Sequence, residues 1–269
     1  MGAENSTLGT SSLNIMCYNI LVELHKAGRP SDPQARMAQT ILQMDTDVLG
    51  TQEDNDGNGE AFVKALGSYS VYKGANEVDN GNYVYWKTEK LNVLDKGYYY
   101  LSDTPEQRSK FSDSKHYRTM TYVVFEIKDT GARFLFIDTH LQNNNASYGC
   151  TDQTRYKQLC VLSALVQQIN KDGLPVIIMG DLNTASDAES IKAFKRENPI
   201  FSEAQDVALT TGDVGYTFAY NFMDREYTID HIFVSTDRNR VKYFTVVDNK
   251  TDGKYPSDHL PLFAQIELI

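Results

Sequence analysis

The feature that most constrains the fold of this 269-residue chain is a pattern that occurs twice: an apolar strand, a helix, and a second apolar strand that ends in polar residues. The predicted elements are strand 13–20, helix 31–44 and strand 47–53 in the first half, and strand 132–141, helix 152–169 and strand 174–183 in the second. The repeated pattern therefore predicts an α/β fold.

Local signals mark the predicted helices. The long second helix carries apolar residues at helical spacing, namely Leu159, Leu162, Val166 and Ile169. Asp32 is expected to cap the first helix, with Pro33 at its first helical position. Ser186 and Glu189 have the spacing of a capping box, which predicts a short helix after the 174–183 strand.

Further β-rich segments lie between and after these units, at residues 83–87, 92–101, 119–127, 227–235, 240–247 and 260–269. Strands covered by helices on one face and by a second sheet on the other form an α/β (α+β) sandwich. No segment has the composition of a linker or a low-complexity tract. We therefore expect a single domain over residues 13–269, preceded by a flexible polar lead at residues 1–12.

The formal net charge of −10 argues against an extended nucleic-acid-binding surface, because affinity for duplexes comes mainly from Lys and Arg. It leaves room for phosphate chemistry at a small site where divalent metal ions supply positive charge. No apolar run approaches the ~18 residues of a membrane span. The polar lead lacks an apolar signal core, so a cytoplasmic protein and an exported protein whose signal peptide is absent both stay open. We expect a monomer.

The chain has three cysteines, Cys17, Cys150 and Cys160, without a C-x-x-C motif. This number and spacing fit neither a disulfide framework nor a zinc cluster. Cys17 lies in an apolar run and is expected in the core. Cys150 and Cys160 could pair in an oxidising compartment.

Polar residues collect where predicted strands end or meet loops: Asn19, Glu53, His140, Asp181, Asn183, Asp230, His231, Asp258 and His259. In α/β folds, ligands bind at such strand ends, where loops meet over a rigid sheet. The positions of these residues therefore predict one site.

Each of these residues also has an ordinary explanation. Asn19 and residues 180–183 could simply form turns, and Glu53 could belong to a solvated acidic loop. His140 could be a core histidine paired with a neighbouring carboxylate. Asp230 is harder to explain in this way, because a carboxylate inside an apolar strand must find a partner.

Together, these carboxylates, amides and imidazoles suit metal-assisted hydrolysis. Hard oxygen ligands bind Mg²⁺ or Mn²⁺, and such an ion polarises a phosphoryl oxygen. A histidine beside a carboxylate can take a proton from water. The sequence contains no G-x-S-x-G nucleophile motif, no P-loop and no dinucleotide-binding G-x-G-x-x-G.

The order and spacing of six motifs resemble those of the endonuclease/exonuclease/phosphatase superfamily of deoxyribonuclease-I-like phosphohydrolases. The motifs are "YNI", "TQE", "DTHL", "GDLN", "IDHIF" and "SDHLPL". The resemblance runs from about Leu13 to the end of the chain. It implies a four-layered α/β sandwich, with two mixed β-sheets packed face to face and helices outside.

The resemblance also implies roles for the matching residues. His259 would be the general base, oriented by Asp230, and Asp181 would align the attacking water. His140 would face the phosphate and assist the leaving oxygen. Asn183 would hold the phosphate, while Glu53, Asn19 and Asp258 would bind Mg²⁺ or Mn²⁺.

Other polar residues have weaker signals. Arg118, just before a predicted strand, could reach the phosphate as a bidentate donor or lie on the surface. Arg155 is expected to have a structural role, and His116 is either a loop residue or lies at the edge of the site. His231 should point to the sheet face opposite Asp230, because side chains alternate along a strand.

Departures from known branches limit the substrate prediction. Apurinic endonucleases carry a further acidic residue where this chain has Leu21, and the inositol 5-phosphatase signature is missing. Residues 83–106 resemble bacterial members of unassigned substrate, and the loop that begins at Leu101 should border the site. The loops at 142–150 and 210–225 are expected to shape substrate fit.

The leading hypothesis is a Mg²⁺- or Mn²⁺-dependent phosphodiesterase, acting on a nucleic acid, a lipid headgroup or a small phosphorylated molecule. One alternative is a phosphomonoesterase of a small phosphorylated metabolite, sugar or inositol phosphate. A second alternative is an inactive binding module that keeps the fold.

Overall fold

The computed structural model describes residues 11–22, 28–75, 81–220, 222 and 224–269. Within these residues the chain forms two large mixed sheets and one small hairpin. The larger sheet contains, in spatial order, β10 (Thr210–Thr211), β14 (Asn239–Val246), β15 (Leu262–Leu268), β1 (Ser11–Asn19), β2 (Val48–Asp54), β4 (Gly81–Lys87) and β3 (Tyr69–Tyr72). The second contains β5 (Leu91–Tyr100), β6 (Thr119–Ile127), β7 (Arg133–His140), β8 (Val176–Asp181), β13 (Asp230–Ser235) and β9 (Phe201–Glu203). The hairpin pairs β11 (Phe218–Tyr220) with β12 (Asp224–Tyr227).

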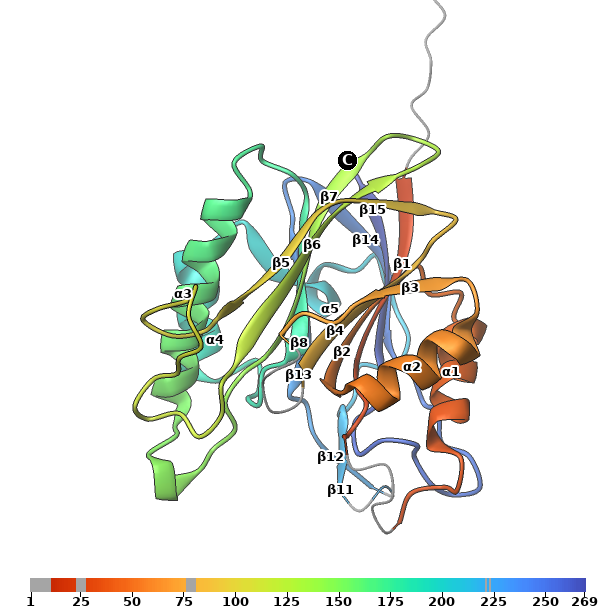
Figure 1. Cartoon of the computed structure of the whole chain (residues 1–269), viewed down its shortest axis with the longest axis horizontal. Helices are drawn as coiled ribbons and strands as arrows, with labels where there is room; N and C mark the ends of the chain where they lie inside the picture. The colour runs from red at the N-terminus through yellow and green to blue at the C-terminus, as the bar shows by residue number, and fades with distance from the viewer. Residues whose placement is uncertain (1–10, 23–27, 76–80, 221, 223) are drawn as a thin grey trace, which may run out of the picture.

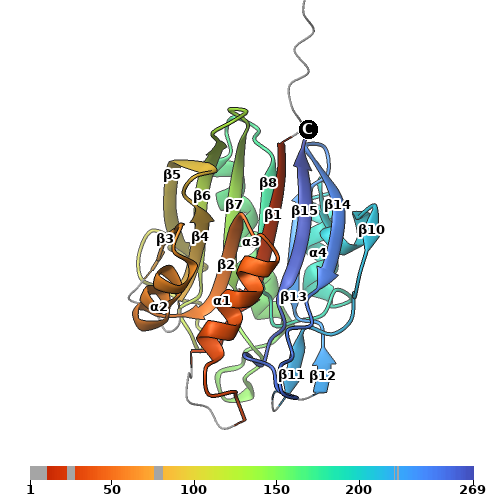
Figure 2. The same cartoon turned by 90° about the vertical axis from the view of Figure 1, so that its right-hand side faces the viewer.

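The two large sheets pack face to face with helices outside, as the sequence predicted (Figure 1). The helices are α1 (Pro33–Gln43), α2 (Asp56–Leu66), α3 (Asp152–Ile169), α4 (Glu189–Glu197), the short α5 (Ala204–Val207) and a 3₁₀ turn, η1 (Ala146–Tyr148). Helices α1 and α2 lie on the outer face of the β1–β2 sheet, and α3 and α4 on the outer face of the β7–β8 sheet (Figures 1 and 2). This arrangement is the four-layered sandwich.

The central strands contain long apolar runs because both of their faces are buried. On β1, Ile15 and Cys17 point into the core between the sheets, whereas Met16 and Tyr18 pack beneath α1. On β7, Phe134 and Phe136 face the same inter-sheet core and the intervening side chains pack against α3. Alternating side chains thus bury both faces of each strand, which explains the continuous apolar runs.

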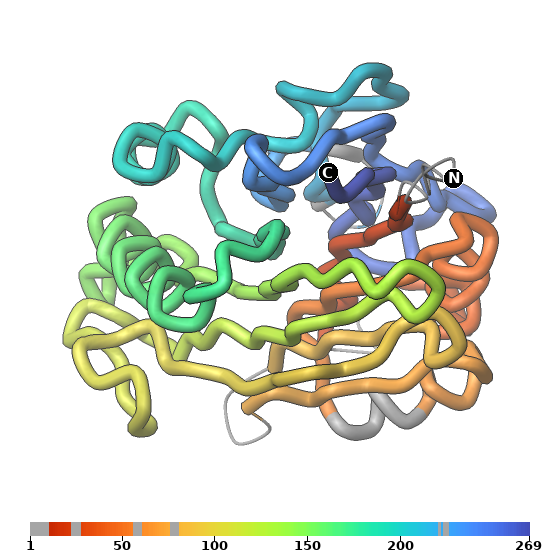
Figure 3. The backbone as a smooth tube through the Cα atoms, turned by 90° about the horizontal axis from the view of Figure 1, so that it is seen from above, coloured from red at the N-terminus to blue at the C-terminus, as the bar shows by residue number. Residues whose placement is uncertain are grey.

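The two repeated units form corresponding parallel pairs, one in each sheet. β1 runs parallel to β2, and β7 runs parallel to β8. Figure 3 shows β1 in red beside the blue C-terminal strand β15, which is its antiparallel neighbour. The carboxyl ends of β1 and β2 carry Asn19 and Glu53, and those of β7 and β8 carry His140 and Asp181.

Most predicted boundaries agree with the structure, but several local predictions were wrong. Ser11 and Ser12 belong to β1, so the expected flexible lead at 1–12 extends too far, and its remaining residues lie outside the described part. Residues 227–235 form two strands, β12 and β13, and not one. The alternative that Glu53 lies in a solvated loop does not match the structure, because Glu53 lies in β2 and helix α2 follows it.

Both predicted caps lack the expected side-chain hydrogen bond. Pro33 begins α1 as predicted, but the Asp32 carboxylate accepts a hydrogen bond from Arg36 Nε at 2.7 Å and makes no cap. Ser186 donates to Glu203, and Ala188 is the N-cap of α4. Thr151 and Thr154 form a capping box at the start of α3 instead.

All three cysteines are free. Cys17 is buried in the inter-sheet core, as predicted. Cys150 is buried and Cys160 is exposed on α3, so the disulfide considered above is not formed. Among the described helices, none combines the length and apolarity needed to span a bilayer.

Candidate active site

Strand register places three predicted site residues at the same level of one sheet. His140 on β7 is the register partner of Asp181 on β8, and Asp181 is the partner of Asp230 on β13. These residues are far apart in the sequence, but adjacent strands lie only about 4.8 Å apart. Their side chains therefore gather at one end of the sheet.

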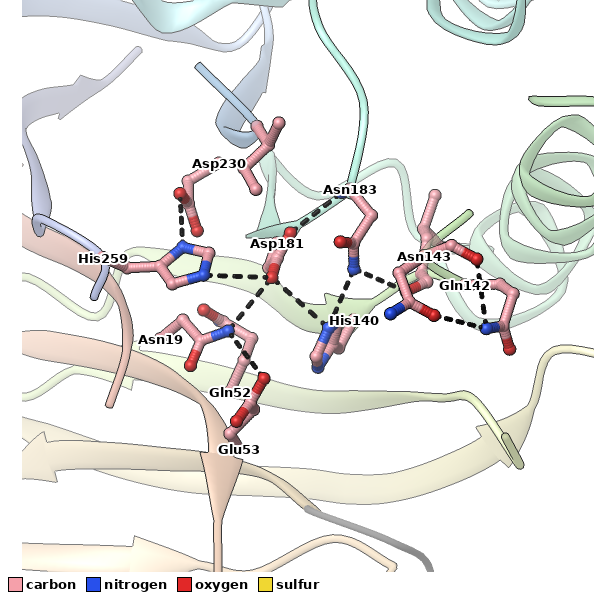
Figure 4. Close-up of polar contacts among 12 residues, drawn as sticks. Asn19, Gln52, Glu53, His140, Gln142, Asn143, Asp181, Asn183, Asp230 and His259 are labelled. Atoms are coloured by element: carbon pink, nitrogen blue, oxygen red, sulfur yellow. Dashed lines mark hydrogen bonds and ion pairs between the residues drawn. The ribbon is translucent and has the colours of Figure 1, made fainter. Parts of the chain in front are cut away.

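The other sheet supplies the opposite wall of the site (Figure 4). Asn19 Nδ2 donates to Asp181 Oδ2 at 3.0 Å and lies 3.4 Å from Glu53 Oε1. His259 enters from the loop before β15, and its Nε2 lies 3.7 Å from Asp181 Oδ2. The Asp181 carboxylate thus contacts side chains from both walls of the site.

His259 and Asp230 form a buried hydrogen-bonded pair. The distance from His259 Nδ1 to Asp230 Oδ2 is 2.9 Å, and the same oxygen accepts a 2.6 Å hydrogen bond from Thr217 Oγ1. Burial lowers the pKa of His259, but the carboxylates of Asp230 and Asp181 outweigh burial and raise it to about 10. The bond to Nδ1 leaves Nε2 directed at Asp181.

Burial raises the pKa of Asp181, and the nearby Asp230 carboxylate adds to this rise. Several contacts oppose it: the His259 charge, the Asn183 backbone N–H at 2.8 Å from Oδ1, and the Asn19 amide. His140 Nε2 lies 3.3 Å from Oδ2. This carboxylate can therefore exchange a proton with its neighbours near neutral pH.

Two polar groups contact the same ring nitrogen of His140. Asn183 Nδ2 donates to the Leu141 carbonyl at 3.0 Å and lies 3.0 Å from His140 Nε2, and Asp181 Oδ2 lies 3.3 Å from that nitrogen. The amide can only donate and the carboxylate can only accept, so these two contacts require opposite roles of Nε2. Burial and the Arg118 charge lower the pKa of His140 well below its ordinary value, which favours the neutral ring.

Two site residues adopt the left-handed backbone conformation, Glu53 with φ 55° and Asn183 with φ 53°. Such conformations cost free energy at non-glycine residues and cluster at functional sites. Glu53 Oε2 accepts a 3.4 Å hydrogen bond from the Val22 backbone N–H, and the side chain stays partly exposed. Its carboxylate is thus open to a ligand from solvent.

Oxygen donors for a divalent cation lie on both walls. Glu53 and Asn19 are in contact as predicted, and the Asp258 charge acts on His259 and on Arg29. Asp181, Asp230 and His259 also bring one potential ligand atom each within 4.8 Å of one another. Asp230 Oδ1 is buried with no hydrogen-bond partner among the described residues. Carboxylate and amide oxygens of this kind fit Mg²⁺ or Mn²⁺.

Arg118 is buried beside the site and does not lie on the surface. It precedes β6, and the charges of Arg118 and His116 both lower the pKa of His140. The His116 backbone N–H donates to Gln142 Oε1 at 3.0 Å, which joins this segment to the loop after His140. Both residues therefore border the site.

The residues predicted to be structural make contacts outside the site. His231 points to the opposite face of β13, where Nδ1 lies 3.2 Å from Glu203 Oε2 and Nε2 lies 2.8 Å from the Thr184 carbonyl. Arg155 bonds the Gln142 carbonyl at 3.2 Å and Asp152. Both residues support the loops that carry Asn183 and Gln142.

Sequence patterns missed several supporting residues. Arg29 is buried and donates to the carbonyls of Ile20, Leu21 and Pro256, which ties the end of β1 to the segment before His259. Ser257 reinforces this connection with a 2.7 Å hydrogen bond to the Asn19 carbonyl. No motif in the sequence marks these contacts.

Thr217 and Phe218 lie within the 210–225 loop that was expected to shape the site. Phe218 pairs with His259 as an isolated antiparallel bridge, and their rings are 5.1 Å apart in an edge contact. The loop thus touches the predicted base directly, and it also contributes the Thr217 hydroxyl to Asp230.

Comparison with known proteins gives matches over most of the chain. The family model described as Endonuclease/Exonuclease/phosphatase family matches residues 16–259. A curated relative, the CCR4-Not complex 3'-5'-exoribonuclease subunit Ccr4 of Aspergillus niger, is 24% identical. The match covers 82% of this chain but only 45% of that protein, so this chain spans less than half the length of the relative.

Solved structures with the same fold include two from Bacteroides thetaiotaomicron. An endonuclease/exonuclease/phosphatase family protein is 23% identical with a TM-score of 0.86, covering 97% of this chain and 99% of the other. A mannosyl-6-phosphatase is 24% identical with a TM-score of 0.83, covering 96% and 99%. The human Nocturnin catalytic domain is 19% identical with a TM-score of 0.74, covering 97% and 98%. These likenesses establish the fold.

Proposed function

This chain belongs to the endonuclease/exonuclease/phosphatase family, whose members are hydrolases of phosphoester bonds, and we propose that it is a divalent-metal-dependent phosphodiesterase. The observation that carries the proposal is the buried His259–Asp230 pair, which directs its free ring nitrogen at Asp181. A base, its orienting carboxylate and a second carboxylate at one strand end are the groups needed to activate water.

In this proposal His259 Nε2 takes the proton from the attacking water. Asp230 fixes the tautomer by accepting the Nδ1–H, and Thr217 holds the same Asp230 oxygen in place. The carboxylates of Asp230 and Asp181 favour the protonated ring, because they raise the pKa of His259. The positive charge of a cation held by the neighbouring carboxylates would oppose this rise, and His259 Nε2 would then be free to accept the proton.

Glu53, Asn19 and Asp258 would hold the metal ion, with Mg²⁺ or Mn²⁺ as the candidates. When bound, such an ion offsets charge on the phosphoryl oxygens. Glu53 suits this role because its partly exposed carboxylate is held by the left-handed backbone and by Val22 N–H. Arg29 keeps the segments that carry Asn19 and Asp258 together.

Asn183 and Arg118 would bind the phosphate. The Asn183 amide donates to the Leu141 carbonyl and lies 3.0 Å from His140 Nε2, which orients that side chain. His140 would therefore orient Asn183. The sequence-based hypothesis that His140 faces the phosphate and assists the leaving oxygen is kept as a second role of the same ring.

The competing function within the same family is phosphomonoester hydrolysis. One structural neighbour is a mannosyl-6-phosphatase, although the 24% identity carries the fold alone. The inactive-module hypothesis requires that the His259–Asp230 pair and the Glu53–Asn19 contact serve no purpose. The His231–Glu203 pair shows that a buried ion pair can be structural, whereas the His259–Asp230 pair lies beside a partly exposed carboxylate, Glu53, which argues for a function.

The test is hydrolysis of bis(p-nitrophenyl) phosphate and of p-nitrophenyl phosphate, each with Mg²⁺ or Mn²⁺ and with EDTA. We expect metal-dependent cleavage of the diester in the wild type and its loss in His259→Ala, with unchanged circular dichroism. Cleavage of the monoester alone would replace the diesterase proposal with the phosphatase. No cleavage of either substrate would favour the inactive module.

A further inference from the structure

The loop between β5 and β6 carries cations that are not paired with carboxylates. Elsewhere in this acidic chain many basic side chains form ion pairs, among them those of Arg36, Lys87, Lys90, Arg133, Lys157, Lys195, Arg240 and Lys242. Arg108, Lys110 and Lys115 have no carboxylate within ion-pair distance among the described residues. We call these three cations, together with Tyr117 and Tyr148, the cationic rim.

Tyrosine rings hold two of these cations in place. The Arg108 guanidinium lies 4.5 Å from the centre of the Tyr117 ring. Lys110 Nζ lies 5.7 Å from the same ring and 5.8 Å from that of Tyr148. Contacts of this kind orient a cation without neutralising its charge, so the charge stays available to an anion.

The cationic rim is also fixed by backbone contacts. Lys110 Nζ donates to the carbonyls of Ser114 and Lys115 at 2.7 and 2.9 Å. Tyr148 belongs to η1, whose flanking residues Asn145 and Cys150 exchange two backbone hydrogen bonds. Tyr148 is nevertheless 51% exposed, so its ring forms part of the surface.

The rim lies next to the candidate active site. Tyr117 directly precedes Arg118, whose charge acts on His140, and His116 N–H bonds Gln142 in the loop after His140. The strand register agrees with this position. Met120, two residues after Arg118, pairs with Thr139, the residue that precedes His140. The rim therefore borders the segment that carries Arg118 and the loop that follows His140.

Acidic residues of the same loop do not cancel this charge. Asp113 is engaged by Lys157 Nζ at 2.5 Å and by Thr154 Oγ1 at 2.8 Å. Glu106 lines a cavity with Tyr99 and Tyr122, whose stacked rings pack on the helix-covered side of the sheet. The other two carboxylates of the loop, those of Asp103 and Glu106, form no ion pair with a rim cation among the described residues. The rim thus carries three cations outside ion pairs, within a chain of net charge −10.

We propose that the cationic rim is a subsite for a second phosphate group of the substrate. The inference rests on the proposed function and narrows it to phosphoesters that carry a further phosphate nearby. A neighbouring phosphate of a nucleic acid strand and a second phosphate on a small molecule present the same chemistry. A lone surface cation would attract either one weakly, whereas a set of oriented cations adds charge-assisted hydrogen bonds.

The test compares the binding of thymidine 3′,5′-bisphosphate with that of thymidine 5′-monophosphate by calorimetry, using the His259→Ala protein with Mg²⁺ to prevent turnover. The rim variant is Arg108→Gln/Lys115→Gln, which spares the hydrogen bonds of Lys110. The charge-matched control is Lys128→Gln/Lys171→Gln, at the opposite strand ends. We expect the bisphosphate to bind about tenfold more tightly than the monophosphate, a preference that the rim variant loses and the control keeps.

Equal affinities of the two nucleotides, or a preference unchanged in the rim variant, would overturn the subsite. A short oligothymidylate is then compared with the bisphosphate. If it binds more tightly than the bisphosphate, and the rim variant loses this difference, the rim binds a phosphate of a nucleic acid strand. If it binds no more tightly, the rim binds the second phosphate of a small bisphosphorylated molecule. The diester assay above separates these results from a failure of the proposed function, since it requires no second phosphate.

Discussion

Asp181 and Asp230 are register partners on adjacent antiparallel strands, and both carboxylates act on the imidazole of His259. Asp230 Oδ2 lies 2.9 Å from His259 Nδ1, and Asp181 Oδ2 lies 3.7 Å from His259 Nε2. Two buried carboxylates facing one ring stabilise its protonated form. Most of the behaviour expected of the site follows from this relationship.

Asp230→Asn removes one of these charges and the orienting acceptor. We expect the pKa of His259 to fall and kcat to drop by roughly 100- to 10,000-fold, because the ring loses its fixed tautomer. Thr217→Ser keeps the hydroxyl and should be nearly neutral, whereas Thr217→Ala should reduce kcat. NMR titration of His259 measures the pKa, and a kcat within a factor of a few of wild type in Asp230→Asn would remove Asp230 from the mechanism.

The rate should rise with pH, since the base works in its deprotonated form. The carboxylates raise the pKa of His259, so the rising limb should lie above the ordinary histidine value at low metal concentration. More metal should move the midpoint toward lower pH, because a cation repels the imidazolium proton. The apparent pKa belongs to the coupled His259–Asp181 system. A midpoint that is independent of metal in pH–rate profiles would contradict the proposed metal position.

Glu53→Gln removes a charged oxygen donor from the proposed metal site. We expect the concentration of Mn²⁺ needed for half-maximal rate to rise about 10- to 100-fold, with a matching loss of Mn²⁺ binding measured by electron paramagnetic resonance. Glu106→Gln removes the same charge from a carboxylate on the other side of the sheet and serves as the control. Unchanged Mn²⁺ binding in Glu53→Gln would reassign the ligand set.

The buried His231–Glu203 pair should stabilise the fold in a defined pH window. Burial raises the pKa of Glu203, but His231 outweighs it and the result is a pKa of about 2. Burial lowers the pKa of His231, whereas Glu203 raises it above its ordinary value of 6.5. The carboxylate's contribution is present above its ordinary pKa of 4.5 and is lost as pH falls toward 2.

The contribution of His231 has the opposite sign. It is fully present below pH 6.5 and is lost as pH rises through the raised folded-state pKa. Glu203→Gln should therefore cost most between pH 4.5 and 6.5, about 3 kcal/mol of unfolding free energy. Urea unfolding at pH 3, 5.5 and 9 tests this, and a cost that does not vary with pH would show that packing dominates.

Gly180 permits the close approach of β7 and β8 beside the site. Its φ is 152°, and a Cβ there would collide with the Thr139 carbonyl oxygen. Gly180→Ala should destabilise the protein by several kcal/mol and displace Asp181. Gly131→Ala is the control, because its φ of 69° is also left-handed but a Cβ would meet open space. Thermal unfolding should show that Gly131→Ala lowers the unfolding free energy by only about 1 kcal/mol. An equal loss in Gly131→Ala and Gly180→Ala would indicate that the backbone conformation, and not the contact with Thr139, causes the loss.

Sequence patterns predicted the long buried strands and helices α1 and α3, and they missed helix α2. Burial of a strand or helix face can be predicted from the periodicity of a single segment. The apolar runs of β1 and β7 show this, as does the helical spacing of Leu159, Leu162 and Val166. The placement of polar residues after those runs was equally visible, because strand ends are local features too. The family resemblance added roles to these positions, and those roles stay predictions until they are measured.

Local patterns failed where a partner comes from a distant segment. Asp32 bonds Arg36 and Asp152 accepts from the Ser190 N–H at the start of α4, so neither helix start follows its own capping signal. Thr217 and Arg29 acquire their roles only through contacts with Asp230 and with Pro256. A side chain's hydrogen-bond partner is selected by the packing of whole sheets, and the sequence around it carries no record of that choice.

Local sequence patterns were enough to predict which strands are buried on both faces, where the central ones end, and which ionisable groups stand at those ends. The packing of the two sheets was needed to show that His140, Asp181 and Asp230 share one register level, that Asn19 bridges the sheets to Asp181, and that burial and the Arg118 charge lower the pKa of His140. The reason is physical: strand formation depends on short-range periodicity, whereas register and protonation state depend on distances of a few ångströms between segments far apart in the chain.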